Sequence, residues 1–172
     1  MSELPTVVVA RIDQSGLPAF EELRCSPSAD NLTGASQFQL VWEIPEVPDV
    51  PSRIGELARD LAMPKPGGVK VGRAVLLARS AGKTDVTELF SDEERSGFVV
   101  PEDNPAMHQT DSVDVEFIIS GKVDVIFPGG RKRTLQAGDF MVMGGVPHEW
   151  SNPYDEDCVL TIAIVGARRT VS

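Results

Sequence analysis

Short apolar runs, many of them alternating with polar residues, dominate the chain and are separated by Gly, Pro, Asn and Asp. The runs are rich in Val, Ile, Phe and Thr, a pattern typical of strands that bury one face. Tight reversals are predicted at residues 128–130 and 137–139, which contain Gly. Many short strands at close spacing predict an all-β sandwich or barrel. The predicted strands are residues 6–13, 37–44, 69–78, 113–120, 122–127, 133–136, 140–143 and 158–165.

One segment, residues 51–63, has apolar residues at helical rather than strand spacing. A helix is therefore predicted here, packed against the outside of the sheet. A second helical turn fits residues 91–95. The apolar stripe of the first helix consists of Ile54, Leu57, Ala58 and Leu61.

Residues 80–106 are polar, acidic and without a regular pattern. Connections of this length are usually either functional or disordered. Because the stretch leads directly into His108, we interpret it as a flap over a site, with a plain surface loop as the alternative. The chain length predicts one structural domain. Within it, residues 1–66 supply N-terminal strands and a helix that pack on the barrel, residues 67–172 form the barrel, and residues 80–106 are a flap-like insertion.

The formal net charge of the chain is −10, and its isoelectric point is near 4.6. An acidic surface repels nucleic-acid phosphates and anionic lipids, so neither nucleic acid nor membrane is expected as a partner. The sequence shows no signal-peptide pattern and no apolar run long enough to cross a bilayer. We therefore expect a cytoplasmic protein that binds a small-molecule ligand.

The predicted strand at residues 6–13 lies outside the main group of strands. An unpaired edge strand can pair with the same strand of a second copy, and two-fold dimers are the commonest soluble oligomers. A homodimer is therefore expected.

The two histidines of the chain, His108 and His148, each lie in a recognisable motif. Residues 107–121 read MHQTDSVDVEFIISG, and residues 138–152 read GDFMVMGGVPHEWSN. They resemble the two motifs of the cupin superfamily. The first of these is His-x-His, three or four residues, Glu, six residues and Gly; the second is Gly-Asp, a strand, a Gly-containing turn, His, three residues and Asn. The resemblance implies a small single-domain cupin, an all-β double-stranded β-helix or jelly-roll barrel with one or two short helices.

The first motif departs from the family pattern at two of its metal ligands. Thr110 replaces the second histidine, and Asp114 replaces the glutamate. The resemblance then leaves His108, His148 and Asp114 as the metal-ligand set. Two imidazoles and one carboxylate suffice for a divalent ion such as Fe, Mn, Ni or Zn. The shorter aspartate loses about 1.3 to 1.5 Å of reach, so a metal-bound and a metal-free site both remain open.

Strand alternation adds a second acid to the interior. If Asp114 points into the barrel, Glu116 points to the same side, and burial with mutual repulsion raises the pKa of at least one of them. A bulge that turns Glu116 to solvent is the alternative. The predicted catalytic residues are Glu116, Asp114 and His148.

The remaining lining is predicted to be apolar. By alternation, either Phe140 and Val142 or Met141 and Met143 face inward. Such an interior suits a hydrophobic or aromatic hydroxy or keto compound. The predicted substrate contacts are Met107, Thr110, Phe140, Val142 and Trp150.

Three functions follow from these residues. The first is a metal-assisted oxygenase, isomerase or lyase. The second is a metal-free dehydratase or isomerase, in which a histidine removes a proton and an interior acid protonates the leaving hydroxyl. The third is a non-catalytic small-molecule binding module. An enzyme is preferred, because placing several polar groups in an apolar barrel carries a desolvation cost. The metal-assisted enzyme is the leading hypothesis, and the other two functions are its alternatives.

Overall fold

The computed structural model describes residues 6–12, 14–15, 17–25, 30–31, 34–50 and 53–170, and within them the fold is all-β. All eight predicted strand regions contain a strand, although Asp13 lies outside the described residues. The strands are β1 (Thr6–Ile12), β2 (Pro18–Arg24), β3 (Asp30–Asn31), β4 (Ser36–Ile44), β5 (Val69–Leu76), β6 (Phe98–Val99), β7 (Gln109–Thr110), β8 (Ser112–Ser120), β9 (Lys122–Phe127), β10 (Arg131–Gln136), β11 (Phe140–Gly144), β12 (Glu149–Ser151) and β13 (Cys158–Gly166).

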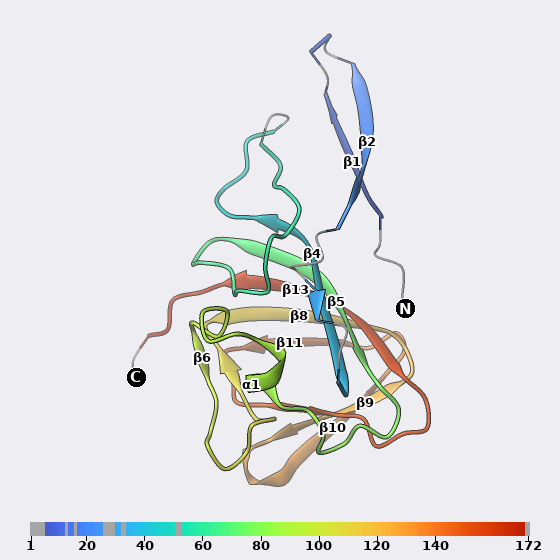
Figure 1. Ribbon diagram of the computed structural model, residues 1–172, viewed down its shortest axis with the longest axis vertical. Helices are drawn as coiled ribbons and strands as arrows, with labels where there is room; N and C mark the ends of the chain where they lie inside the picture. Colours follow the sequence, from blue (N-terminus) through green and yellow to red (C-terminus); the bar gives the residue numbers. More distant parts are fainter. Residues whose placement is uncertain are drawn as a thin grey trace.

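Two antiparallel sheets form the barrel (Figure 1). The larger sheet has six strands in the order β11-β8-β13-β5-β4-β3, and the smaller has the order β10-β9-β12. Hairpin β1–β2 forms a separate two-stranded sheet that stands away from the barrel (Figure 1). The predicted reversals at residues 128–130 and 137–139 connect β9 to β10 and β10 to β11.

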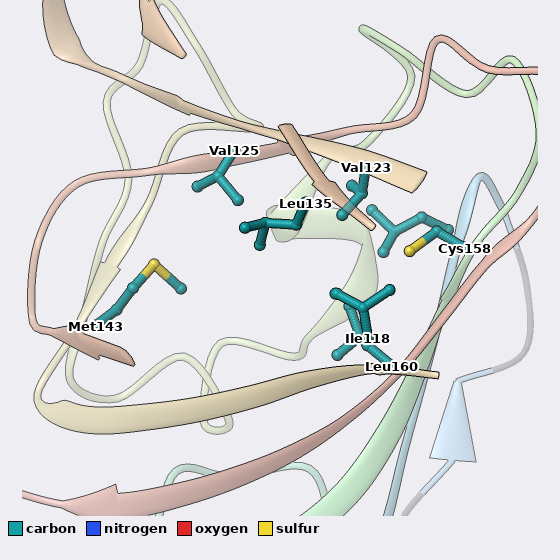
Figure 2. Close-up of a cluster of buried hydrophobic side chains, with 8 residues drawn as sticks. Ile118, Val123, Val125, Leu135, Met143, Cys158 and Leu160 are labelled. Atoms are coloured by element: carbon teal, nitrogen blue, oxygen red, sulfur yellow. The ribbon is translucent and has the colours of Figure 1, made fainter. Parts of the chain in front are cut away.

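The two sheets meet in a shared apolar core. Figure 2 shows side chains from both sheets pointing toward one another inside the barrel. Burying these side chains is the main favourable term that holds the two sheets together. The buried members of this cluster are Leu76, Ile118, Val123, Val125, Leu135, Met143, Cys158 and Leu160.

The helix predicted at residues 51–63 is wrong. Residues 51 and 52 lie outside the described residues, and the rest of the segment runs extended beside β4. Glu43 and Glu56 exchange backbone hydrogen bonds of 2.8 and 2.9 Å. Gly55 has φ +107°, and a Cβ there would lie 2.4 Å from the Glu43 carbonyl oxygen. The apolar residues of the segment are buried without a helix, because Ala58 and Leu61 pack into the core from an extended backbone.

The one α-helix in the described part of the chain is α1 (Val86–Leu89), which lies within the segment predicted as a flap. Asp85 caps it by accepting a hydrogen bond from the Thr87 backbone N–H. The turn predicted at 91–95 falls in a series of turns at residues 92–97 rather than in a helix. No helix in the described residues has the length and apolar character needed to cross a bilayer.

Strand β8 has an unusual polarity. Its buried positions alternate regularly, and they include Ser112, Asp114 and Glu116 as well as Ile118. An antiparallel strand of a barrel usually places its apolar residues inside and its polar residues outside. In β8 the interior therefore receives the acids, while the outer face receives valine, phenylalanine and isoleucine.

Candidate functional site

The structure brings the two histidines into direct contact. His108 and His148 form an isolated antiparallel bridge in which each backbone N–H donates to the other's carbonyl oxygen at 2.9 Å. Their ring centroids lie 4.4 Å apart. The pairing joins the end of the 80–106 segment to the turn before β12. The backbone hydrogen bonds between these two segments therefore hold the two imidazole rings next to each other.

Backbone carbonyls fix the orientation of both rings. His108 Nδ1 lies 3.1 Å from the Ala106 carbonyl oxygen, and His148 Nδ1 lies 2.9 Å from the Val146 carbonyl oxygen. A carbonyl oxygen only accepts hydrogen bonds, so each Nδ1 carries the proton in this arrangement. Each Nε2 is then left with a lone pair that can accept a hydrogen bond or a proton.

Burial keeps both imidazoles neutral. Desolvation, followed by the neighbouring His148, lowers the pKa of His108 to about 3, against a smaller opposing effect of its bond to Ala106. Desolvation also lowers the pKa of His148. At neutral pH the pair therefore consists of two hydrogen-bond acceptors rather than two cations.

Two acids share the interior of β8. Glu116 is 1% exposed, and neither of its carboxyl oxygens has a hydrogen-bond partner in the described structure. Asp114 Oδ2 accepts a 3.4 Å hydrogen bond from Thr110 Oγ1, while its Oδ1 has no partner there. Thr110 thus occupies the place of the motif's second histidine and contacts the acid that replaces the motif's glutamate.

Burial also controls the protonation of these acids. Desolvation, with a further contribution from Asp114, raises the pKa of Glu116 to about 8. Desolvation raises the pKa of Asp114 against the lowering effect of hydrogen bonds from Ser112 and Thr110. Strand β8 pairs with β11 without a register shift, so the bulge considered for Glu116 is not formed there. Glu116 is protonated at neutral pH and can donate a hydrogen bond.

One cavity of about 100 Å³ contains these groups. His108, His148, Asp114, Glu116 and Thr110 line it, and its remaining wall is almost entirely apolar. No Lys or Arg is among the described residues of the lining. Its other lining residues are Ser36, Gln37, Phe38, Met63, Ala74, Leu76, Thr84, Val86, Leu89, Phe90, Phe98, Ala106, Trp150, Leu160, Ile162 and Ile164.

A series of aromatic rings in mutual contact lines this cavity. Phe38 contacts Phe90, Phe90 contacts Phe98, and Phe98 contacts His108, with centroid distances of 5.5, 5.2 and 5.9 Å. Trp150 lies at the other end, 6.2 Å from His148 in an edge-to-face arrangement. The three phenylalanines were not among the residues predicted from the sequence. Phe90 and Phe98 are the large aromatic residues of the otherwise polar 80–106 stretch, and that contrast was the available signal.

The segment predicted as a flap forms one wall of the cavity. Thr84, Val86, Leu89, Phe90, Phe98 and Ala106 all contribute to the lining. Asn31 Nδ2 donates a 2.8 Å hydrogen bond to the Leu89 carbonyl oxygen, which ties α1 to β3. The segment therefore forms part of the cavity wall, and its role as a flap stays a prediction.

The predicted substrate contacts divide into two groups. Thr110 and Trp150 line the cavity, whereas Met107 is partly buried outside its lining. The inward orientation of Phe140 and Val142 is wrong, since their side chains are 67% and 64% exposed on the outer face. Register explains this result: β11 lies beside β8 with Phe140 opposite Phe117, an outward residue, so the alternate residues Met141 and Met143 pack inward.

The predicted metal-ligand set does not assemble as expected. Among the described residues, no group of three or more His, Cys, Asp or Glu side chains is placed to hold a metal ion. The Asp114 carboxyl group is engaged by Thr110 and Ser112, and aspartate has less reach than the glutamate of the family pattern. The residues present therefore do not fit the two-histidine, one-carboxylate site.

The comparisons with known proteins point to one family. Residues 99–165 match the Cupin domain family model. Phomopsin biosynthesis cluster protein D of Diaporthe leptostromiformis is 35% identical over 54 residues, which are 31% of this chain and 29% of that protein. Oryzines biosynthesis cluster protein J of Aspergillus oryzae is 39% identical over 49 residues, 28% of this chain and 27% of that protein. The matched segment thus spans less than a third of each of these relatives.

Solved structures resemble the chain at low sequence identity. The Schizosaccharomyces pombe Cnp3 cupin domain has a TM-score of 0.49 and 10% identity, over 96% of this chain and 89% of that one. A Cupin 2 conserved barrel domain protein from Salinispora arenicola has a TM-score of 0.47 and 14% identity, over 86% of this chain and 90% of that one. The barrel topology of the described residues and the match of residues 99–165, which contain both motifs of residues 107–152, show an all-β cupin fold.

Proposed function

We propose that the cavity binds a small organic molecule and moves protons on it, as a dehydratase or an isomerase does, with Glu116 as the acid and the imidazole pair as the base. The observation that supports this proposal most strongly is the Glu116 carboxyl group. It is buried, has no protein partner in the described residues, and lines the same cavity as two imidazoles. A buried polar group without a partner is costly, so its presence favours a role toward a ligand.

The two kinds of group complement each other chemically. A protonated carboxyl group with a pKa near 8 can donate a proton to a carbonyl or departing hydroxyl oxygen near neutral pH. Once Glu116 has lost its proton, its negative charge favours proton uptake by an imidazole in the same cavity. Proton donation at one atom of the ligand and proton removal at another therefore support each other, and together they leave the net charge of the cavity unchanged.

The lining restricts the class of substrate. Without Lys or Arg in the described lining, the cavity offers no partner for a carboxylate or phosphate of a ligand. An apolar cavity of about 150 Å³ is known to hold benzene, so about 100 Å³ suits a compound of a few heavy atoms. We therefore propose a small, uncharged hydroxy or keto compound. The names of the fungal relatives, which refer to biosynthesis clusters, are consistent with a role in small-molecule metabolism.

Hydrogen exchange in D₂O tests the proposal even while the product is unidentified. A panel of small hydroxy ketones and hydroxy esters is incubated with the protein, and loss of the C–H signal next to the carbonyl is followed by NMR. We expect the wild type to exchange this proton, and Glu116→Gln and His148→Gln to slow exchange by about 100-fold or more. Glu102→Gln, a matched change at an exposed carboxyl, should exchange like the wild type.

Two outcomes contradict the proposal. The first is exchange that persists unchanged in both site variants. The second is a compound that binds in the cavity, seen as shifts of the histidine ring signals, without any exchange. That result would support the non-catalytic binding module instead.

Added metal distinguishes this proposal from the metal-assisted alternative. We expect the melting temperature of protein purified without chelator to be unchanged by Fe²⁺, Mn²⁺, Ni²⁺ or Zn²⁺. An ion at 100 times its dissociation constant would add about 2.7 kcal/mol of stability if it bound only the folded state. A rise in melting temperature that disappears in both His108→Ala and His148→Ala would support ligation by the pair and contradict the metal-free form.

A further inference from the structure

The outer face of the large sheet is apolar where solvent should meet it. The reversed polarity of β8 places Val113 and Ile119 outside, and they are 38% and 50% exposed. On β11, Phe140 and Val142 are more exposed still. The outward positions of these strands and of β13 carry no charge, and they are Val113, Val115, Phe117, Ile119, Phe140, Val142, Gly144, Val159, Thr161, Ala163 and Val165.

These residues form one continuous surface because of the register. Phe140 lies opposite Phe117 with ring centroids 4.6 Å apart, and Val142 lies opposite Val115. Val115 in turn lies opposite Ala163 on β13. An antiparallel sheet with a solvated face normally carries polar residues there, and a large apolar patch marks an interaction site. We call the surface formed by these outward residues of β8, β11 and β13 the outer face.

We propose that the outer face is the interface of a homodimer, formed by two copies of this chain that pack these sheets against each other. Charge favours this occupant. Each molecule carries a net charge of −10, so two copies repel one another over most approaches. The outer face is a surface on which copies can meet without bringing like charges together.

Shape and size also fit a second copy. A two-fold axis requires the same patch on both partners, and a twisted sheet of β-branched and aromatic residues can pack on another such sheet about 10 Å away. With strands about 4.8 Å apart and about 3.4 Å per residue, three strands of seven residues span roughly 340 Å² of flat area. Protruding side chains raise the accessible area toward the roughly 600 Å² per partner of the smallest specific interfaces. We therefore expect a dimer that dissociates on dilution.

Sedimentation velocity over a dilution series tests this interface. The wild type should sediment as a dimer at about 50 μM, and the double variant Phe140→Asp with Val142→Asp should be a monomer at the same concentration. Val47→Asp, an equally polar change at a 78% exposed residue away from the barrel sheets, should remain dimeric. Val8→Asp on β1 tests the edge-strand dimer expected from residues 6–13, and it should also remain dimeric.

A milder pair guards against unfolding of β11. Phe140→Ser with Val142→Thr should keep the circular dichroism of the wild type and raise the dimer dissociation constant at least tenfold. A monomeric wild type at 100 μM overturns the proposal. So does a dimer that withstands both double variants and is lost in Val8→Asp, since that result assigns the interface to the N-terminal hairpin.

Discussion

Glu116→Gln should stabilise the fold by an amount that increases with pH between about 4.5 and 8. The folded protein holds the proton of Glu116 up to a pKa of about 8, whereas the ordinary pKa of an exposed glutamate is 4.5. Between these values the unfolded state has lost the proton and the folded state has kept it. The free energy of unfolding therefore falls by about 1.4 kcal/mol for each pH unit, on the order of 4 kcal/mol across the window. Gln has no proton to lose, so the variant escapes this decline.

The histidines act in the opposite direction and at lower pH. The pKa of His108 falls from 6.5 to about 3 on folding, so the unfolded state binds the proton that the folded state rejects. The contribution of His108 to stability is complete above about pH 6.5 and is lost as the pH falls toward 3. Between pH 4.5 and 6.5 the effects of His108 and Glu116 oppose each other. The two slopes nearly cancel there, so the stability of the wild type should change little between pH 4.5 and 6.5 and decline above pH 6.5, where the effect of Glu116 is unopposed.

Urea unfolding at half-unit steps from pH 4.5 to 8.5 measures the difference between Glu116→Gln and the wild type. The contribution of the histidines is common to both proteins, so the difference isolates Glu116. Glu102→Gln is the matched control, and its difference from the wild type should not depend on pH in this way. A difference for Glu116→Gln that is flat over the whole range would show that Glu116 titrates normally in the folded protein. The assignment of Glu116 as a neutral acid would then be lost.

Alternation and the two motifs were sufficient to predict seven of the nine described strands of the two barrel sheets, and the short strands β3 and β12 were missed. They were also sufficient to predict that the motifs containing His108 and His148 approach one another. Residues 51–63 show where this reasoning fails. Their apolar spacing fits a helix as well as an extended segment with buried residues at irregular intervals, and the positive φ of Gly55 is incompatible with a continuous helix.

The site shows a different limit. The orientation of Phe140 and Val142 depends on the register of β11 against β8, and a one-residue slip reverses every side chain of a strand. The phenylalanines of the cavity come from parts of the chain far from the motifs, and their position depends on tertiary contacts. Local patterns carry no information about such contacts. The sequence therefore predicted that residues 80–106 lie near the site, but it did not predict which of these residues line the cavity.

The turn between β8 and β9 should be one of the least tolerant positions of the chain. Gly121 has φ +75°, and a Cβ there would lie 2.2 Å from the Asp157 carbonyl oxygen and 2.9 Å from Cys158 Cα. Both obstacles are backbone atoms, which cannot rotate away as a flexible side chain can. Gly138 provides a matched comparison, because its φ is +94° and a Cβ there would meet nothing within 4 Å.

Gly138→Ala should therefore cost only the strain of a positive φ, about 1 to 2 kcal/mol. Gly121→Ala should cost that strain together with displacement of the strand that begins at Cys158, in total more than about 3 kcal/mol. Urea denaturation of both variants beside the wild type measures the difference. Equal losses would mean that the approach of Asp157 to Gly121 is not close. A much larger loss at Gly121 would show that the end of β8, which carries Asp114 and Glu116 into the cavity, is held in position by this backbone contact with β13.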